Sequence, residues 1–149
     1  MNELLAGIGH RISSARKSKK MTQEALAELA DVSYQTISSA ELGKKALRPE
    51  KLANLVKMEA KQIEAWGLYA MVYTYTNFAD TALDMDALAA YDLWIADYRG
   101  RRPTRRHGMW QYTDKGSVPG VKNGVDLSHA YKDYPAIIKK AGLGKMKGA

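Results

Sequence analysis

The chain of 149 residues contains no cysteine, so neither a disulfide framework nor a thiolate metal site can form. It has no apolar run near the ~20 residues that a membrane-spanning helix needs. Its start lacks the apolar stretch of a secretory signal, so we expect a cytoplasmic protein with no membrane partner. Glutamate is absent after Glu64, and the only aromatic residue before Trp66 is Tyr34.

The charged residues that are present give the chain a formal net charge of +7 and a pI near 9.5. A basic surface attracts nucleic acid, anionic wall polymers or anionic lipid, and charge alone does not choose among them. Together with the loss of glutamate and the rise in aromatic residues near residue 65, this composition suggests two segments of different origin. We predict one domain over residues 1–60 and a second over residues 61–149.

The first segment has the pattern of several short helices. Apolar residues recur at helical spacing over residues 3–19, 23–30, 34–42 and 50–66. Thr22 and Ser33 stand where helix N-caps are expected, and Gly43 is a natural helix stop. Two short helices joined by a tight turn at residues 31–32 form a helix-turn-helix arrangement.

The stretch MTQEALAELADVSYQTISSAELGKKALRPEKLANL resembles the Cro/phage-repressor (XRE) helix-turn-helix family over about residues 6–58. The resemblance implies an all-α bundle of four to five helices that binds double-stranded DNA as a homodimer and places its third helix in the major groove. It implies a structural salt bridge between Arg16 and Glu41. The residues that it assigns to DNA binding are Gln23, Tyr34, Gln35, Thr36, Ser39, Lys44 and Lys45.

The second segment alternates strand and helix patterns. Aromatic and branched residues predict strands over residues 68–76, 93–98, 109–113 and 125–127, and short helices are expected over residues 85–90 and 134–141. Such alternation favours an α/β fold with parallel strand pairing.

The pieces AMVYTYTNF, LWIADY, MWQYTDKGSVPGV and VDLSHAYKDYP resemble the C-terminal part of the glycoside hydrolase family 25 lysozymes, the Chalaropsis-type muramidases. The resemblance covers about residues 60–142. It implies an α/β fragment with the last strands of a β/α barrel, in a family that cleaves peptidoglycan. The residues that it places at the remnant of the site are a vestigial Asp126 and the groove residues Tyr73, Tyr75, Trp94, Asp97, Trp110 and Gln111.

Glycoside cleavage normally needs two carboxyl groups, and the chain lacks the Asp-x-Glu pair that the family carries. We therefore predict a repressor-like, sequence-specific DNA-binding regulator fused to a catalytically incomplete lysozyme remnant, without a cofactor, in a phage or prophage setting. The alternatives are a peptidoglycan hydrolase, with Asp97 or Asp80 as second carboxylate, and a module that binds wall glycan or an anionic polymer. The arginine-rich run at residues 99–108 suits an anion. His107 and His129 are too isolated to form a metal site.

Overall fold

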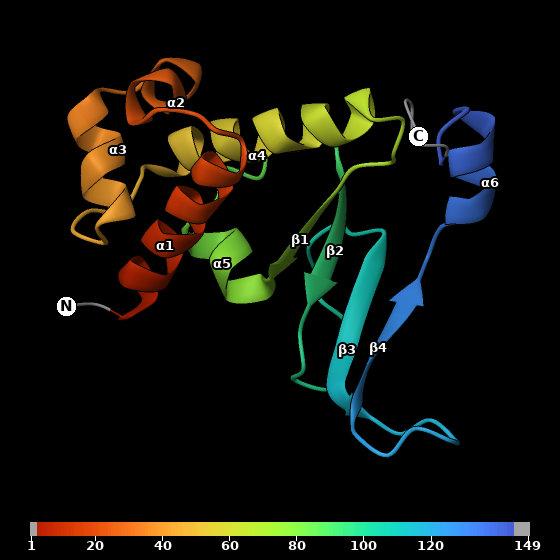
Figure 1. Ribbon diagram of the computed structural model, residues 1–149. Helices are drawn as coiled ribbons and strands as arrows, with labels where there is room; N and C mark the ends of the chain where they lie inside the picture. The colour runs from red at the N-terminus through yellow and green to blue at the C-terminus, as the bar shows by residue number, and fades with distance from the viewer. Residues whose placement is uncertain (1–2, 145–149) are drawn as a thin grey trace. The chain divides into compact units, whose positions relative to one another are not determined.

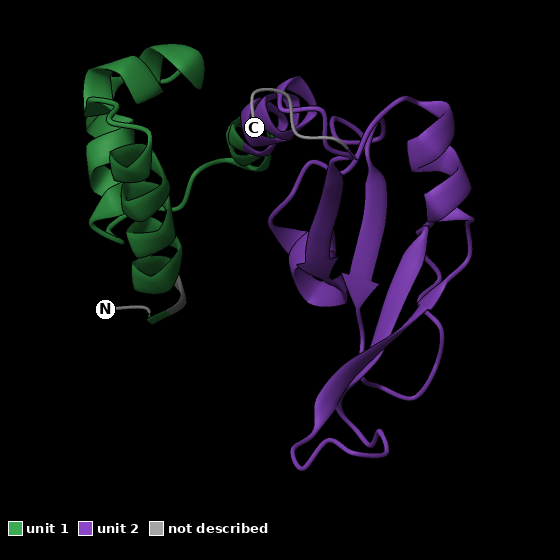
Figure 2. Ribbon diagram, turned by 45° about the vertical axis from the view of Figure 1, so that its right-hand side comes forward, with its two compact units in different colours: residues 1–55 green, residues 56–149 purple. Residues whose placement is uncertain are grey.

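The computed structural model describes residues 3–144 of the chain (Figure 1). They divide into two compact units, which we call the helical unit (residues 1–55) and the strand unit (residues 56–149) (Figure 2). The predicted domains, residues 1–60 and 61–149, stay a prediction, because one helix runs without a break through that boundary. Among the described helices, none is both long and apolar enough to cross a membrane.

Four helices form close to the predicted ranges: α1 (Glu3–Ser18), α2 (Gln23–Leu29), α3 (Tyr34–Glu41) and α4 (Pro49–Ala65). The two predicted caps begin α2 and α3. The Thr22 hydroxyl accepts a hydrogen bond from the Ala25 amide at 3.1 Å, and the Ser33 hydroxyl accepts one from the Thr36 amide at 3.2 Å. Each bond satisfies an amide that has no partner inside its helix, which is why these helices begin where they do.

The core of the helical unit contains Leu26 of α2 with Ile37 and Ala40 of α3, all of them buried. Gly9 brings the backbone of α1 against α3, because a Cβ at this position would lie 2.7 Å from the Glu41 carbonyl oxygen. Gly43 adopts a φ of +64°, a conformation that L side chains rarely adopt, and ends the α3 segment as predicted.

The strand unit contains one mixed sheet of four strands in the order β1-β2-β3-β4. The strands are β1 (Met71–Tyr75), β2 (Asp92–Ala96), β3 (Met109–Gly116) and β4 (Val125–Ala130). The first three are parallel, as the alternating pattern predicted, but β4 pairs antiparallel with β3. The expectation of parallel pairing throughout was wrong, because residues 117–124 are too few for a crossover and form a hairpin turn instead.

Two helices of this unit also differ from the expectation. Helix α5 (Thr76–Thr81) follows β1 directly and lies next to it, in a stretch for which the sequence predicted no element beyond the strand end at residue 76 (Figure 1). Residues 85–90 form turns with bonds between residues three apart rather than the predicted helix, although Asp84 caps them as expected. Helix α6 (Tyr134–Lys140) forms as predicted.

The sheet has two faces of different character, because successive side chains of a strand point to opposite sides. On one side, which we call the packed face, Val72, Thr74, Leu93 and Ile95 are all buried. The side chains between them define the open face: Tyr73, Tyr75, Trp94 and Gln111, with Ser128 and Asp126 on β4. Tyr73 and Tyr75 are 54% and 45% exposed there, so the open face is available to a ligand.

Candidate active site on the open face

The centre of the open face is a hydrogen-bonded cluster that joins three strands. The Tyr73 hydroxyl donates to Oε1 of the buried Gln111 at 2.5 Å. The ring of Tyr73 meets that of Trp94 edge to face, with the ring centroids 5.1 Å apart. The Trp94 indole N–H donates to the Ser128 hydroxyl at 3.2 Å. The sheet therefore holds a tyrosine and a tryptophan in fixed orientations, as a platform for a sugar ring requires.

Two aspartates of neighbouring strands lie near this cluster. Thr113 pairs with Leu127, and the next residues on the two antiparallel strands are Asp114 and Asp126. Both carboxylates act on the hydroxyl of Tyr98. Partial burial, the neighbouring Tyr73 and these two negative charges raise the pKa of Tyr98 to about 12, although the residue as a whole is 48% exposed. Asp126 was predicted at the site, whereas Asp114 was not.

Asp114 escaped the sequence analysis because its position depends on strand register. The pairing of β3 with β4 shifts between Gln111 and Thr113 and again before Gly116. Such bulges place an extra residue on one strand and change which side chains share a face. The signal available in the sequence was the aspartate directly after the Trp-Gln-Tyr-Thr run, followed by a turn rich in glycine and proline.

The other predicted groove residues do not all lie together. Asp97 and Trp110 turn toward the packed face, where the Trp110 indole N–H donates to the backbone carbonyl of Asp97 at 2.9 Å. Tyr75 is on the open face and packs against Phe78, with ring centroids 5.7 Å apart. Grouping Asp97 and Trp110 with Tyr73 and Trp94 was therefore wrong in geometry, since strand alternation separates the two pairs.

Asp97 is not available as an acid or a base. Its carboxylate accepts from the Arg99 Nε at 2.8 Å and from Arg99 Nη2 at 2.5 Å, and from the Thr76 hydroxyl at 2.7 Å. These hydrogen bonds hold the pKa of Asp97 well below its usual range, against the opposing effect of its burial. Asp80, the other predicted second carboxylate, forms an ion pair with Arg105 at 2.6 Å.

The two histidines of the strand unit form ring and backbone contacts, and no group of three His, Cys, Asp or Glu side chains that could hold a metal ion is found among residues 3–144. The ring of His129 stacks on Tyr112 at 4.5 Å between centroids. His107 lies beside the backbone carbonyl of Arg105, with 2.6 Å between its Nδ1 and the oxygen.

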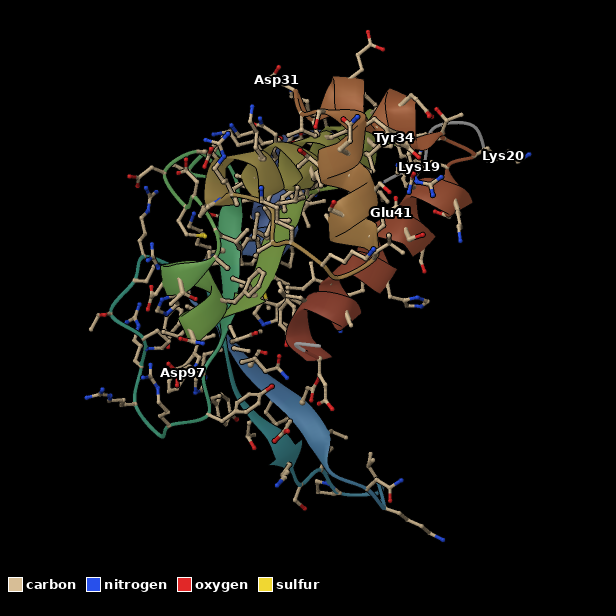
Figure 3. All side chains as sticks on the ribbon, turned by 90° about the vertical axis from the view of Figure 1, so that its left-hand side faces the viewer. Lys19, Lys20, Asp31, Tyr34, Glu41 and Asp97 are labelled. Atoms are coloured by element: carbon tan, nitrogen blue, oxygen red, sulfur yellow. The ribbon has the colours of Figure 1, made fainter. Side chains whose placement is uncertain are left out.

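The helical unit contains the predicted ion pair between Arg16 and Glu41, and Gln23, a predicted DNA contact, bonds to the same pair. Arg16 Nε donates to Glu41 Oε1 at 2.6 Å, and Arg16 Nη2 to Glu41 Oε2 at 2.9 Å. The Gln23 amide donates to the same Glu41 Oε2 at 2.8 Å, and its side chain is half-buried. Tyr34 is 43% exposed on α3 (Figure 3). The Thr36 hydroxyl bonds to that of Ser33. Of the other predicted contacts, Gln35, Lys44 and Lys45 are exposed and Ser39 is half-buried.

Comparison with known proteins links this geometry to bacterial lytic enzymes. A family model described as glycosyl hydrolases family 25 matches residues 13–121. The autolytic lysozyme of Clostridium acetobutylicum is 34% identical over 80 residues, which cover 52% of this chain and 24% of that protein. This chain thus spans about a quarter of the length of the curated relative.

Two solved structures are also similar. The spore cortex lytic enzyme SleM of Clostridium perfringens matches with a TM-score of 0.53 and 23% identity, over 73% of this chain and 45% of that one. The CTP1L endolysin matches with a TM-score of 0.48 and 29% identity, over 64% of this chain and 34% of that one.

These findings correct the predicted fold class. The hydrolase match begins inside α1 and continues through β3 to residue 121, so it does not begin at a truncated C-terminal part. The chain is a lysozyme-like α/β domain with a mixed sheet, and not an all-α helix-turn-helix bundle followed by a barrel fragment. The four helices themselves form as predicted, and only their assignment to a repressor family was wrong.

The predicted function is corrected with the fold class. The prediction of a DNA-binding regulator is wrong, because the family matched across the helices is a hydrolase family. The predictions of a double-stranded DNA partner and of a homodimer that reads an operator are wrong for the same reason. Helix caps and a tight turn determine the path of the backbone, but they do not determine what its surface binds. The match over residues 13–121 covers most of the chain, which therefore belongs to the glycosyl hydrolases family 25, an enzymatic family.

Proposed function

We propose that this protein acts on peptidoglycan, with its glycan strand lying on the open face and Asp114 and Asp126 providing the carboxyl groups for hydrolysis. The observation that carries the proposal is that Asp114 and Asp126 lie on neighbouring antiparallel strands beside the aromatic platform, and that both charges affect the hydroxyl of Tyr98. Membership of a glycosidase family and the similarity to an autolytic lysozyme support peptidoglycan as the substrate.

The arrangement meets the main requirement of glycoside hydrolysis. One carboxyl group protonates the leaving oxygen, and the other acts as base or nucleophile. Asp114 and Asp126 each follow the pair Thr113 and Leu127 on the two strands, so both carboxyl groups can approach a glycan that lies across β3 and β4.

The aromatic cluster would position the sugar. The exposed edge of Tyr73 and the ring of Trp94 offer apolar surface for the face of a pyranose ring, while Gln111 and Ser128 fix the two rings in place. A platform that is fixed before binding loses less conformational entropy when the glycan is ordered on it.

A second candidate is a module that binds the same glycan without cleaving it. The observation that favours it is the aromatic platform itself: Tyr73 and Trp94 are held by Gln111 and Ser128, and neither hydrogen bond involves a carboxyl group. The platform is therefore ordered for binding a sugar ring even without chemistry at its edge.

One set of measurements separates the two candidates. The full chain is incubated with purified peptidoglycan, and both sedimentation of the protein with the polymer and release of reducing sugar are followed. The variants are Asp126→Asn and Asp114→Asn, with Glu28→Gln on the exposed side of α2 as a control for the loss of one carboxylate. Hydrolysis predicts that both aspartate variants lose roughly 100-fold or more of the release, while Glu28→Gln retains it.

Binding without release by the unaltered chain would identify the glycan-binding module. In that case Trp94→Ala should abolish sedimentation with peptidoglycan, since the platform loses its largest ring. If the unaltered chain neither bound peptidoglycan nor released reducing sugar, both candidates would be overturned.

A further inference from the structure

The connection between β2 and β3 is unusual for parallel strands. Such strands need a crossover that returns along the sheet, and this crossover is usually a helix. Here residues 97–108 return without a helix (Figure 1). A pocket of about 650 Å³ lies beneath the loop, on the side of the sheet opposite the open face, with the apolar Leu88 and Leu93 in its wall.

The loop is fixed at both ends by ion pairs. Near its start, the buried Asp97 takes both Arg99 Nε and Arg99 Nη2, and Figure 3 labels Asp97 at this point. Near its end, Asp80 of α5 accepts from Arg105 Nη2 at 2.6 Å and from Arg105 Nε at 3.1 Å. Two of the five arginines therefore hold the loop in place, and their charges are neutralised.

The other three arginines of the loop retain donors. Arg102 lies over the ring of Tyr131 at 3.9 Å and gives only its Nε to His107 Nε2, at 3.3 Å. Arg101 and Arg106 are exposed, line the pocket and form no ion pair within the residues that the structure describes. Stacking on an aromatic ring fixes the plane of a guanidinium group and leaves its outer N–H groups available.

The carboxylates around the pocket do not cancel these charges. Asp80 and Asp97 are paired with loop arginines, and Asp92 is paired with Lys132 at 2.5 Å. Of the aspartates that line the pocket, this leaves Asp86 as the one without an ion pair in the described residues. Three guanidinium groups thus face one carboxylate, and the pocket has a surplus of positive charge.

We propose that this pocket binds a phosphate group, either as free phosphate or within a phosphate-containing polymer. A phosphate group offers three oxygens that accept hydrogen bonds and carries nearly two negative charges at neutral pH. Guanidinium groups bind such oxygens in a two-pronged geometry, and three of them line this pocket on a loop that ion pairs hold at both ends. The site lies on the opposite side of the sheet from the open face, so it is independent of the proposed hydrolysis.

The pocket can be tested by calorimetric titration of the full chain with two probes, inorganic phosphate and short-chain polyphosphate. The test variant is Arg101→Gln combined with Arg106→Gln. Its matched control is Lys44→Gln combined with Lys45→Gln, which removes two exposed positive charges from the helical unit. All four side chains are exposed, so the variants should fold, and circular dichroism and tryptophan fluorescence check this.

We expect the arginine variant to bind roughly tenfold more weakly or worse, because it loses charged hydrogen bonds, and the lysine variant to bind as the unaltered chain does. Removal of the unpaired carboxylate in Asp86→Asn should instead strengthen binding severalfold. Equal weakening in the arginine and lysine variants would overturn the site, and so would failure of the unaltered chain to bind either probe.

The two probes also separate the sources of the phosphate group. Saturation by inorganic phosphate that then blocks polyphosphate would identify a site for a single free phosphate. Binding of polyphosphate at concentrations where inorganic phosphate has no effect would identify a site for a polymer. Either result supports the pocket only when it depends on Arg101 and Arg106.

Discussion

Replacement of Asp97 by asparagine tests how the ordered loop is held. The carboxylate accepts four hydrogen bonds: two from the Arg99 guanidinium group, one from the Arg99 amide at 3.1 Å and one from the Thr76 hydroxyl. Asparagine preserves the shape but removes the charge and replaces one acceptor oxygen by a donor. Two charged hydrogen bonds to a buried group are lost, although Arg99 is 58% exposed and water compensates in part.

We expect Asp97→Asn to lower the free energy of unfolding of the strand unit by about 2 kcal/mol at neutral pH. The effect should depend on pH in one direction. The pKa of Asp97 is lowered in the folded state. The unfolded chain therefore binds the proton more readily once the pH approaches the ordinary aspartate pKa of about 3.9. The stabilisation is therefore complete above about pH 5 and is lost as pH falls below about 4.

Urea unfolding followed by tryptophan fluorescence measures this effect, because all three tryptophans lie in the strand unit. A loss of about 2 kcal/mol should lower the urea midpoint by roughly 1–2 M at pH 7. The difference between Asp97→Asn and the unaltered chain should shrink at pH 3. A difference that stayed constant from pH 7 to pH 3 would refute the role of the charge, and equal midpoints at pH 7 would refute the role of the hydrogen bonds.

Three further substitutions test the packing. In Gly108→Ala the new methyl group would overlap the Tyr134 hydroxyl, so thermal unfolding should occur at a lower temperature. Tyr134→Phe in the same chain removes that hydroxyl and should recover part of the lost thermal stability. If it recovers none, this contact is not the cause. Ser33→Ala should cost about 1 kcal/mol through loss of the cap of α3, seen as an earlier loss of helical circular dichroism in urea, whereas Ser33→Asp should retain the cap. Gly9→Ala should destabilise the helical unit by forcing α1 away from α3, while Gly7→Ala, with nothing within 4 Å of its Cβ, should not.

Sequence patterns predicted the elements whose causes are local. Thr22 and Ser33 cap α2 and α3 because a hydroxyl at that position bonds to an amide three residues later, and both residues are next to the helix that they begin. The pair Arg16 and Glu41 is distant in sequence, and it was predicted from a resemblance to another family, yet it forms. The resemblance thus predicted the ion pair correctly and the DNA partner wrongly. Both are possible together because an internal salt bridge stabilises a helical unit whatever its surface binds.

Features that depend on strand register could not be predicted from the sequence. The sequence placed Trp94 and Trp110 in one groove, and strand pairing puts them on opposite faces. Asp114 became visible only through the two shifts between β3 and β4. A change of register by one residue moves a side chain to the other face, so no count along the sequence could have brought Asp114 to Asp126.

The two faces of the sheet allow both proposals to be tested in one protein. Asp126 and Tyr73 belong to the open face, whereas Arg101 and Arg106 belong to the loop over the pocket on the other side. Asp126→Asn should therefore leave phosphate affinity unchanged, and the arginine variant should still sediment with phosphate-free peptidoglycan. A loss of both properties in either variant, with the fold intact, would mean that one ligand spans both regions. Independent losses would instead establish two sites, separated by the same strand alternation that divided the aromatic residues of the sequence.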